Sequence, residues 1–167
     1  MTVTQAAPEH FAEWVAARGG ALQRFAYLTT GSADDAADVV QEALARAFPR
    51  WTSLTARGTA EAYVRRSIVN ASISRWRKEH RVVTGTGHEP APTGDSSQAL
   101  ADSDQAWTLC TGLPPEQRAA VVLRFYEDLS FAEIGRVLGC PEATARSHVH
   151  RALASLRTRL TASEEDS

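Results

Sequence analysis

The stretch that decides the fold is "LSFAEIGRVLGCPEATARSHVHRALASL", residues 129–156, in which two apolar-periodic segments are separated by a Gly-Cys-Pro break. Ser130 and Glu133 form a capping-box pattern, which predicts the start of a helix. Gly139 is well placed to end that helix, and Pro141 suits the start of the next one. Two helices joined by such a short glycine-containing turn make a helix-turn-helix.

The second of these helices has two distinct faces when its residues are placed at about 100° per residue. The apolar face consists of Ala145, Val149, Ala152, Leu153, Leu156 and Leu160. The opposite face carries Thr144, Ser147, His150 and Arg151, with Arg146 and His148 flanking it. Residues 144–160 include four arginines and no acid.

An acid-free outer face suits DNA, because a carboxylate in the major groove would meet phosphate charge. In a helix-turn-helix the second helix reads bases from its N-terminal half, where arginine pairs with guanine and Ser or Thr reaches bases or phosphates. Arg159, further along, is expected to touch phosphate at most. The alternative is an ordinary helical hairpin with a solvated outer face; the pattern favours DNA.

The charge of the chain is segregated by segment although the net charge is only -2 over 167 residues. Residues 61–81 carry six bases and two acids, whereas residues 82–112 carry four acids and no base. Most charge runs are solvated helix faces. This segregation nevertheless favours a polyanionic partner.

Several functional classes are disfavoured. The N-terminus lacks the pattern of a signal peptide, and no stretch is long enough to span a membrane, so we expect a cytoplasmic protein with no membrane partner. Cys110 and Cys140 lack the spacings of a zinc site, and both are expected to be buried small apolar residues. His148 and His150 do not share a helical face, which argues against a metal pair. With no nucleophile–base pair, metal cluster or phosphate loop, we expect no catalytic residue, no metal, no cofactor and no enzymatic activity.

The organisation that we expect is all-α, with two small helical domains joined by a flexible linker. The predicted helices are residues 9–18 (running on after a Gly-Gly pair as 21–28), 32–48, 60–80, 98–110, 113–127, and the two of the helix-turn-helix. The composition of "TGTGHEPAPTGDSS", residues 84–97, predicts a linker. The predicted divisions are a first domain 1–81, an acidic linker 82–105, a helix-turn-helix domain 106–160 and a disordered acidic tail 161–167.

The predicted helix 32–48 begins at Ser32, a suitable N-cap, and ends before Pro49. Its apolar positions are Ala36, Val40, Ala43, Leu44, Ala47 and Phe48. Its other face carries Asp38, Gln41, Glu42, Ala45 and Arg46. The predicted helix 60–80 places Ala62, Val69 and Ile73 inward and much of its positive charge outward.

Three segments, in order, resemble the extracytoplasmic-function (ECF) branch of sigma-70-type RNA polymerase sigma factors. Within that branch, the sequence is most similar to a group common in actinobacteria. "LTTGSADDAADVVQEALARAF" (28–48) is similar to the family's polymerase-binding segment, and "AYVRRSIVNASISRWRKEHR" (62–81) to its minus-10 segment. "LPPEQRAAVVLRFYEDLSFAEIGRVLGCPEATARSHVHRAL" (113–153) is similar to its minus-35 reader. The resemblance covers nearly the whole chain outside the linker and tail.

The resemblance implies roles for individual residues. Contacts with the clamp helices of the polymerase large subunit fall to Asp38, Gln41 and Glu42. Contacts with the opened minus-10 strand fall to Arg66, Asn70, Ser74, Arg75 and Arg77, and Trp76 is either a stacking platform or a core residue. Contacts with minus-35 DNA fall to Arg146, Ser147, His150 and Arg151, and the helical wheel adds Thr144 and His148.

The implied function is that of an alternative sigma factor, with core RNA polymerase, promoter DNA and an inhibitory anti-sigma factor as partners. The family often has Gly at the position of Ala143 and Lys at that of Arg146, so groove contacts are expected to differ in detail. One alternative is a helix-turn-helix regulator without polymerase contact, which leaves the face of Asp38, Gln41 and Glu42 unexplained. Another is a sigma mimic that sequesters an anti-sigma factor, which the basic segment around Asn70 disfavours.

Overall fold

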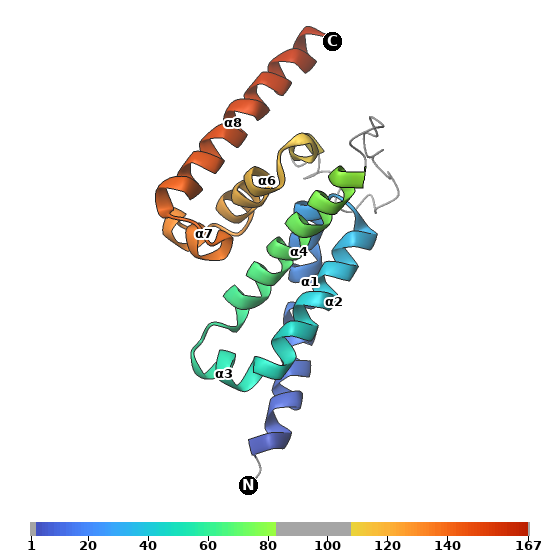
Figure 1. The fold of residues 1–167 in the computed structure, drawn as a ribbon, viewed down its shortest axis with the longest axis vertical. Coiled ribbons are helices and arrows are strands. Elements are labelled where there is room, and N and C mark those ends of the chain that lie inside the picture. Colours follow the sequence, from blue (N-terminus) through green and yellow to red (C-terminus); the bar gives the residue numbers. More distant parts are fainter. Residues whose placement is uncertain (1–2, 83–107, 167) are drawn as a thin grey trace. The chain divides into compact units, whose positions relative to one another are not determined.

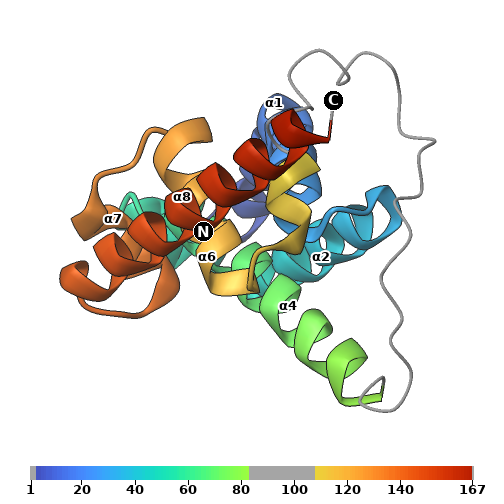
Figure 2. The same ribbon diagram turned by 90° about the horizontal axis from the view of Figure 1, so that it is seen from above.

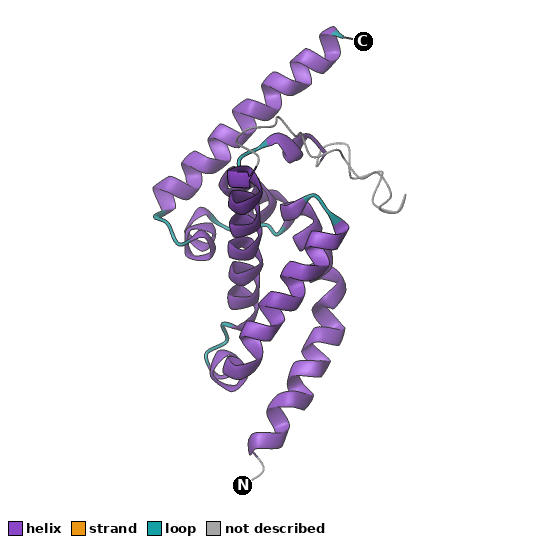
Figure 3. Ribbon diagram, turned by 45° about the vertical axis from the view of Figure 1, so that its right-hand side comes forward, coloured by secondary structure: helices purple, strands orange, loops and turns teal. Residues whose placement is uncertain are grey.

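The computed structural model of the chain describes residues 3–82 and 108–166. Within those ranges Figure 3 shows helices and loops and no strand, which confirms the all-α prediction. The chain divides into two compact units, Met1–Arg75 and Trp76–Ser167. The predicted linker at 84–97 lies outside the described residues, as does most of the predicted helix 98–110.

The first unit is built from four α-helices and one short 3-10 turn (Figure 1). These are α1 (Val3–Thr30), α2 (Ala33–Ala47), η1 (Phe48–Arg50), α3 (Trp51–Ala56) and α4 (Ala60–Val82), of which α4 continues beyond the end of the unit. α1 runs unbroken through Gly19 and Gly20, where the sequence predicts an interruption. Each glycine costs about 1 kcal/mol in a helix, and the packing of α1 along α2 outweighs that cost.

The core of the first unit is formed by the inward faces of α1, α2 and α4. Its fully buried side chains include Phe25, Val39, Val64, Ile68 and Val69. A buried contact of 3.4 Å between Thr29 Oγ1 and Ser72 Oγ joins α1 to α4. At the N-terminal end of α4 an ion pair of 2.6 Å joins Glu61 to Arg18 of α1.

Two predicted inward positions of this unit are wrong. Phe48 is 50% exposed although its backbone is still helical, at the C-cap of α2 where η1 begins. Its ring packs edge-on against Phe11, with the ring centroids 5.1 Å apart. Ala62 is exposed, because it lies about 120° around α4 from the buried Ile68.

From residue 108 to residue 166, the described part of the second unit that follows α4 contains two short turns and three α-helices. They are η2 (Leu109–Gly112), α6 (Pro115–Val121), the π-helical turn η3 (Val122–Tyr126), α7 (Phe131–Leu138) and α8 (Glu142–Glu165). Figure 2 shows α6 and α8 lying side by side. The predicted helix 113–127 is thus α6 followed by a π turn.

The predicted disordered tail at 161–167 is wrong over most of its length, because α8 continues to Glu165. Residues 161–165 contain neither glycine nor proline, so nothing in them ends the helix. Residue 167 lies outside the described residues. No helix in residues 3–82 and 108–166 has the length and apolar character needed to cross a membrane.

The connection between α7 and α8 is closely packed, as a helix-turn-helix requires. The capping box is confirmed: Glu133 N–H donates to Ser130 Oγ and Ser130 N–H donates to Glu133 Oε1, both at 3.2 Å. Gly139 ends α7 in the left-handed region with φ of 70°. A Cβ on Gly135 would lie 2.7 Å from the carbonyl oxygen of Cys140, so only glycine lets the turn approach α7 this closely.

One apolar cluster in the core of the second unit is formed by Cys110, Leu113, Val121, Ala152 and the half-buried Leu156. Burial raises the pKa of the Cys110 thiol, while the nearby Arg118 and Arg159 guanidinium groups partly oppose the shift. Cys110 is therefore a neutral core residue at neutral pH, as predicted. Cys140, in the turn, is only half-buried.

Candidate polymerase and nucleic-acid interface

The outer face of α2 is positioned by a well-defined helix start. Ser32 is the N-cap, and its Oγ accepts a hydrogen bond of 3.3 Å from Asp35 N–H. Along this face Asp38 and Gln41 are exposed and Glu42 is half-buried. Glu42 Oε1 is held 3.1 Å from Arg46 Nη2 one turn later. The three candidate polymerase contacts therefore lie on one accessible surface.

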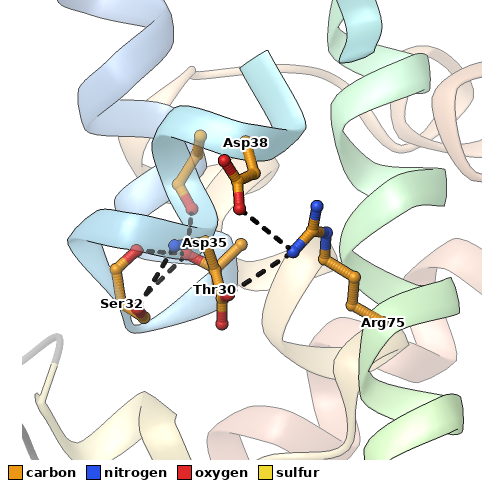
Figure 4. A network of polar contacts seen from close by, with 6 residues as sticks. Thr30, Ser32, Asp35, Asp38 and Arg75 are labelled. Carbon is orange, nitrogen blue, oxygen red and sulfur yellow. Dashed lines mark hydrogen bonds and ion pairs between the residues drawn. The ribbon is translucent and has the colours of Figure 1, made fainter. Parts of the chain in front are cut away.

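A polar network connects this face to α4 (Figure 4). Arg75 Nη1 lies 3.5 Å from Asp35 Oδ1 and 3.5 Å from Asp38 Oδ2. Thr30 supports the same corner, because its Oγ1 accepts from Ser32 N–H at 3.3 Å and donates to Ala26 O at 2.8 Å. Asp38 and Arg75, which the sequence assigns to different partners, are thus in contact with each other.

The candidate minus-10 residues of α4 are not all on one face. Four exposed side chains lie within about 80° of one another around the helix, namely Arg66, Asn70, Ser74 and Arg77, which we call the α4 strip. Arg75 lies about 160° from Arg77, counted at 100° per residue, and is directed at α2 instead. The structure therefore brings four of the six candidates together and separates Arg75 from them.

Trp76 is 38% exposed and is thus not a buried core residue of the described structure. One face of its indole is covered by His80, whose ring stacks at a centroid distance of 3.7 Å and an interplanar angle of 24°. His80 Nδ1 also lies 2.8 Å from the Trp76 carbonyl oxygen. Sequence reasoning missed His80, although its spacing of four residues from Trp76 on a helix is the signal that could have found it.

The recognition-helix prediction agrees with the burial along the N-terminal half of α8. Near the C-terminal end it is wrong for Leu160, which was placed on the apolar face and is 48% exposed. Ala145, Val149 and Ala152 are buried, whereas the predicted outer face, consisting of Thr144, Ser147, His150 and Arg151, is exposed. Ser147 Oγ donates a hydrogen bond of 3.0 Å to Ala143 O, so this hydroxyl is occupied within its own helix.

The two flanking residues of α8 differ in accessibility, since Arg146 is exposed like the outer face and His148 is not. His148 is half-buried, and its Nδ1 is buried with no hydrogen-bond partner in the described part of the chain. Arg146 lies with its guanidinium carbon 5.0 Å from the centroid of the Phe131 ring and its Nη2 3.6 Å from Glu142 Oε1. Sequence reasoning missed both contacts. The contact of Phe131 crosses from α7 to α8, whereas the spacing of four residues between Glu142 and Arg146 is a local signal that could have been found.

Arg159 does not occupy the position expected of a phosphate contact. Its side chain is half-buried, and Nη1 donates a hydrogen bond of 2.6 Å to the carbonyl oxygen of Leu109. The guanidinium also fills the space above Gly112, where a Cβ would lie 2.5 Å from it. Arg159 thus fastens the C-terminal half of α8 to η2.

The described residues contain no group of three or more His, Cys, Asp or Glu side chains placed to hold a metal ion. The chemistry of the accessible surfaces is instead that of charged and hydrogen-bonding side chains on helix faces. Such surfaces can grip phosphates, base edges or another protein.

Comparison with known proteins identifies both segments. The model for "Sigma-70 region 2" matches residues 14–82, which include α2 and α4, and the model for "Sigma-70, region 4" matches residues 104–156, which include α7 and the first half of α8.

Similar whole proteins carry related names. The chain is 36% identical to the RNA polymerase sigma-E factor of Streptomyces coelicolor, over 93% of this chain and 89% of the relative. It is 35% identical to the ECF RNA polymerase sigma factor SigE of Mycolicibacterium smegmatis, over 93% of this chain and 63% of the relative. The sigma factor RpoE in a co-crystal structure with the anti-sigma factor NepR from Bartonella quintana has a TM-score of 0.70 and 25% identity, covering 92% of this chain and 98% of that one. The chain belongs to the ECF subfamily of sigma-70-type RNA polymerase sigma factors.

Proposed function

We propose that this protein binds core RNA polymerase, gives it promoter specificity and directs transcription initiation. The observation that carries the proposal is the order of two matched segments, region 2 followed by region 4, on a chain whose second segment folds as a tight helix-turn-helix with an acid-free outer face. A duplex-binding regulator needs only the helix-turn-helix. The exposed acidic and amide face of α2 has a role only if a second protein binds the chain.

The first unit is proposed to hold polymerase and the opened strand. Asp38, Gln41 and Glu42 contact the clamp helices of the polymerase large subunit, because they form one accessible surface on α2. The α4 strip follows the minus-10 strand: its arginines meet phosphates, and Asn70 at its centre can hydrogen-bond an unstacked base. Trp76 has one ring face covered by His80, so it offers the other to a single base.

The second unit is proposed to read the minus-35 element as duplex DNA. The outer face of α8 enters the major groove, where Arg151 pairs with a guanine and Thr144, Ser147 and His150 reach bases or phosphates. Arg146 and His148 flank this surface at the two edges of the helix.

A further proposed partner is an anti-sigma factor, because the structurally similar RpoE was crystallised with one. The protein itself carries out no covalent chemistry in this proposal, and its place of action is the cytoplasm, where core polymerase and promoters meet.

Run-off transcription tests the proposal. Purified protein is added to core polymerase from the same organism, with pooled genomic promoter fragments as templates, and discrete transcripts that depend on the protein are expected. Transcription without any dependence on the protein contradicts the proposal. Tight binding to an anti-sigma factor without copurification of core polymerase would instead support a sigma mimic.

A further inference from the structure

Two guanidinium groups lie close to the ring of Phe131. The Cζ atom of Arg124 is 4.4 Å from the ring centroid and that of Arg146 is 5.0 Å from it, both within the range of cation–π attraction. The three residues come from three different elements: Arg124 from the π turn η3, Phe131 from the first position of α7, and Arg146 from α8. We call them the arginine–phenylalanine stack.

Phe131 is fixed independently of Arg146. The capping box of Ser130 and Glu133 sets the start of α7, and therefore the backbone from which the ring projects. Arg124, beside the ring, is itself held, because its Nη1 donates a hydrogen bond of 3.0 Å to the Leu129 carbonyl oxygen. The ring is therefore a rigid surface against which a mobile side chain can be ordered.

Arg146 is the most exposed member of the stack. Its side chain is 52% exposed, and its other contact is the equally exposed Glu142, 3.6 Å away. An exposed ion pair of this kind orders a side chain only weakly. The side chain of Arg151, on the outer face of the same helix, has no hydrogen bond, ion pair or ring contact within the described residues. Of the two arginines, only Arg146 is directed before DNA arrives.

We propose that Phe131 is a positioning residue for minus-35 recognition, which acts by directing the Arg146 guanidinium toward the DNA. The inference rests on the proposed function, because it assumes that α8 reads the minus-35 element. An arginine that is already ordered loses less conformational freedom when it binds. The ring also keeps the planar fork of donors in one orientation, so that it favours one pattern of acceptors over others.

The test is a double-mutant cycle on the full-length protein in holoenzyme, with closed-complex formation on a promoter measured by competition. Phe131→Leu removes the ring but keeps an apolar side chain, and we expect it to weaken binding about two- to fivefold. In the background of Arg146→Ala the same change should have no further effect, whereas in the background of Arg151→Ala it should have its full effect. Phe131→Tyr, which keeps the ring, should restore wild-type binding.

Base preference provides a second readout that a purely structural role would not reproduce. On a promoter library randomised in the minus-35 element, Phe131→Leu should relax the same positions as Arg146→Ala and leave those that depend on Arg151 unchanged. Phe131→Met serves as a second ring-free variant, and thermal unfolding identifies any variant that does not fold.

Two outcomes would overturn the inference, and they differ. If Phe131→Leu weakens binding equally with and without Arg146, the ring acts by another route, while minus-35 reading by α8 stands. If Arg146→Ala and Arg151→Ala both leave promoter binding and base preference unchanged, the proposed reading of the minus-35 element fails and the positioning role fails with it.

Discussion

Arg75 Nη1 lies 3.5 Å from Asp38 Oδ2, so a residue that the family resemblance assigns to DNA contacts one that it assigns to polymerase. The same nitrogen lies 3.5 Å from Asp35 Oδ1. The Arg75 side chain is 36% exposed, so each pair contributes about 0.2–1 kcal/mol. The pairs tie α4 to α2, which keeps the α4 strip in register with the outer face of α2.

Arg75→Ala should therefore act on stability more than on DNA preference. We expect the free energy of unfolding to fall by about 0.5–1 kcal/mol at low salt and by less at high salt, because partly exposed pairs are screened. Denaturant unfolding at two salt concentrations measures this. Arg77→Ala provides the comparison, because Arg77 lies on the α4 strip. That substitution should impair strand opening. A variant of Arg75 with unchanged stability but altered minus-10 preference would refute the assignment.

The double substitution Gln41→Ala with Glu42→Ala tests the polymerase face of α2 without disturbing Arg75. Neither residue belongs to the buried core of the unit. The helical content, measured by circular dichroism, should therefore be unchanged. Affinity for core polymerase, measured by competition, should fall about tenfold or more, as for contacts at the centre of an interface. Adding Asp38→Ala should weaken binding further. Asp34→Ala, exposed in the first turn of the same helix, is the control, and equal losses with it would contradict a specific contact.

Arg159→Ala should destabilise the second unit instead of weakening DNA binding. It removes the hydrogen bond to Leu109 O, a loss of about 1–3 kcal/mol for a charge-assisted bond. Gly112→Ala should cost less, because the new Cβ displaces only the end of a flexible side chain. In the background of Arg159→Ala the glycine substitution should be nearly neutral. Thermal unfolding of the four proteins checks this, with the exposed Arg157→Ala as control; additive losses would exclude the shared mechanism.

Gly135→Ala should open the turn of the helix-turn-helix. Its Cβ would lie 2.7 Å from the Cys140 carbonyl oxygen, a backbone atom that cannot rotate away. We expect a loss of about 1–3 kcal/mol, as for overpacking of a core, together with reduced promoter binding. Gly20→Ala is the matched control, because a Cβ there meets nothing within 4 Å, and it should stabilise α1 slightly. Equal unfolding temperatures for the Gly135 variant and wild type would show that the turn is not this tight.

The elements with clear local signals could be predicted from the sequence. The Ser32 cap, the capping box at Ser130 and Glu133, and the glycine end at Gly139 are all determined by residues within four positions of one another. The apolar face of α8 followed from its period. Local chemistry alone was sufficient at these places.

The features that failed or were missed depend on contacts between distant segments. The unbroken α1 is sustained by packing along α2, which outweighs the low helix propensity of its two glycines. Arg159 and Leu109 are fifty residues apart in sequence, and no local pattern pairs them. Arg75 was grouped with its neighbours in sequence, yet successive residues point in directions about 100° apart on a helix. The contact of Phe131 with Arg146 joins two different helices, so no local sequence pattern indicates it.

The central claim is that the protein opens promoters together with polymerase, and permanganate mapping of unpaired thymines tests it most directly. Holoenzyme with the wild-type protein should make minus-10 thymines reactive on a duplex promoter. With Asn70→Ala, core binding should be unchanged and that reactivity reduced, because unstacking a base costs a few kcal/mol that contacts with the flipped base must offset. A template with a pre-opened bubble should partly restore transcription. Tight binding of the protein alone to a duplex operator, with no reactive thymines in the presence of core polymerase, would contradict the account.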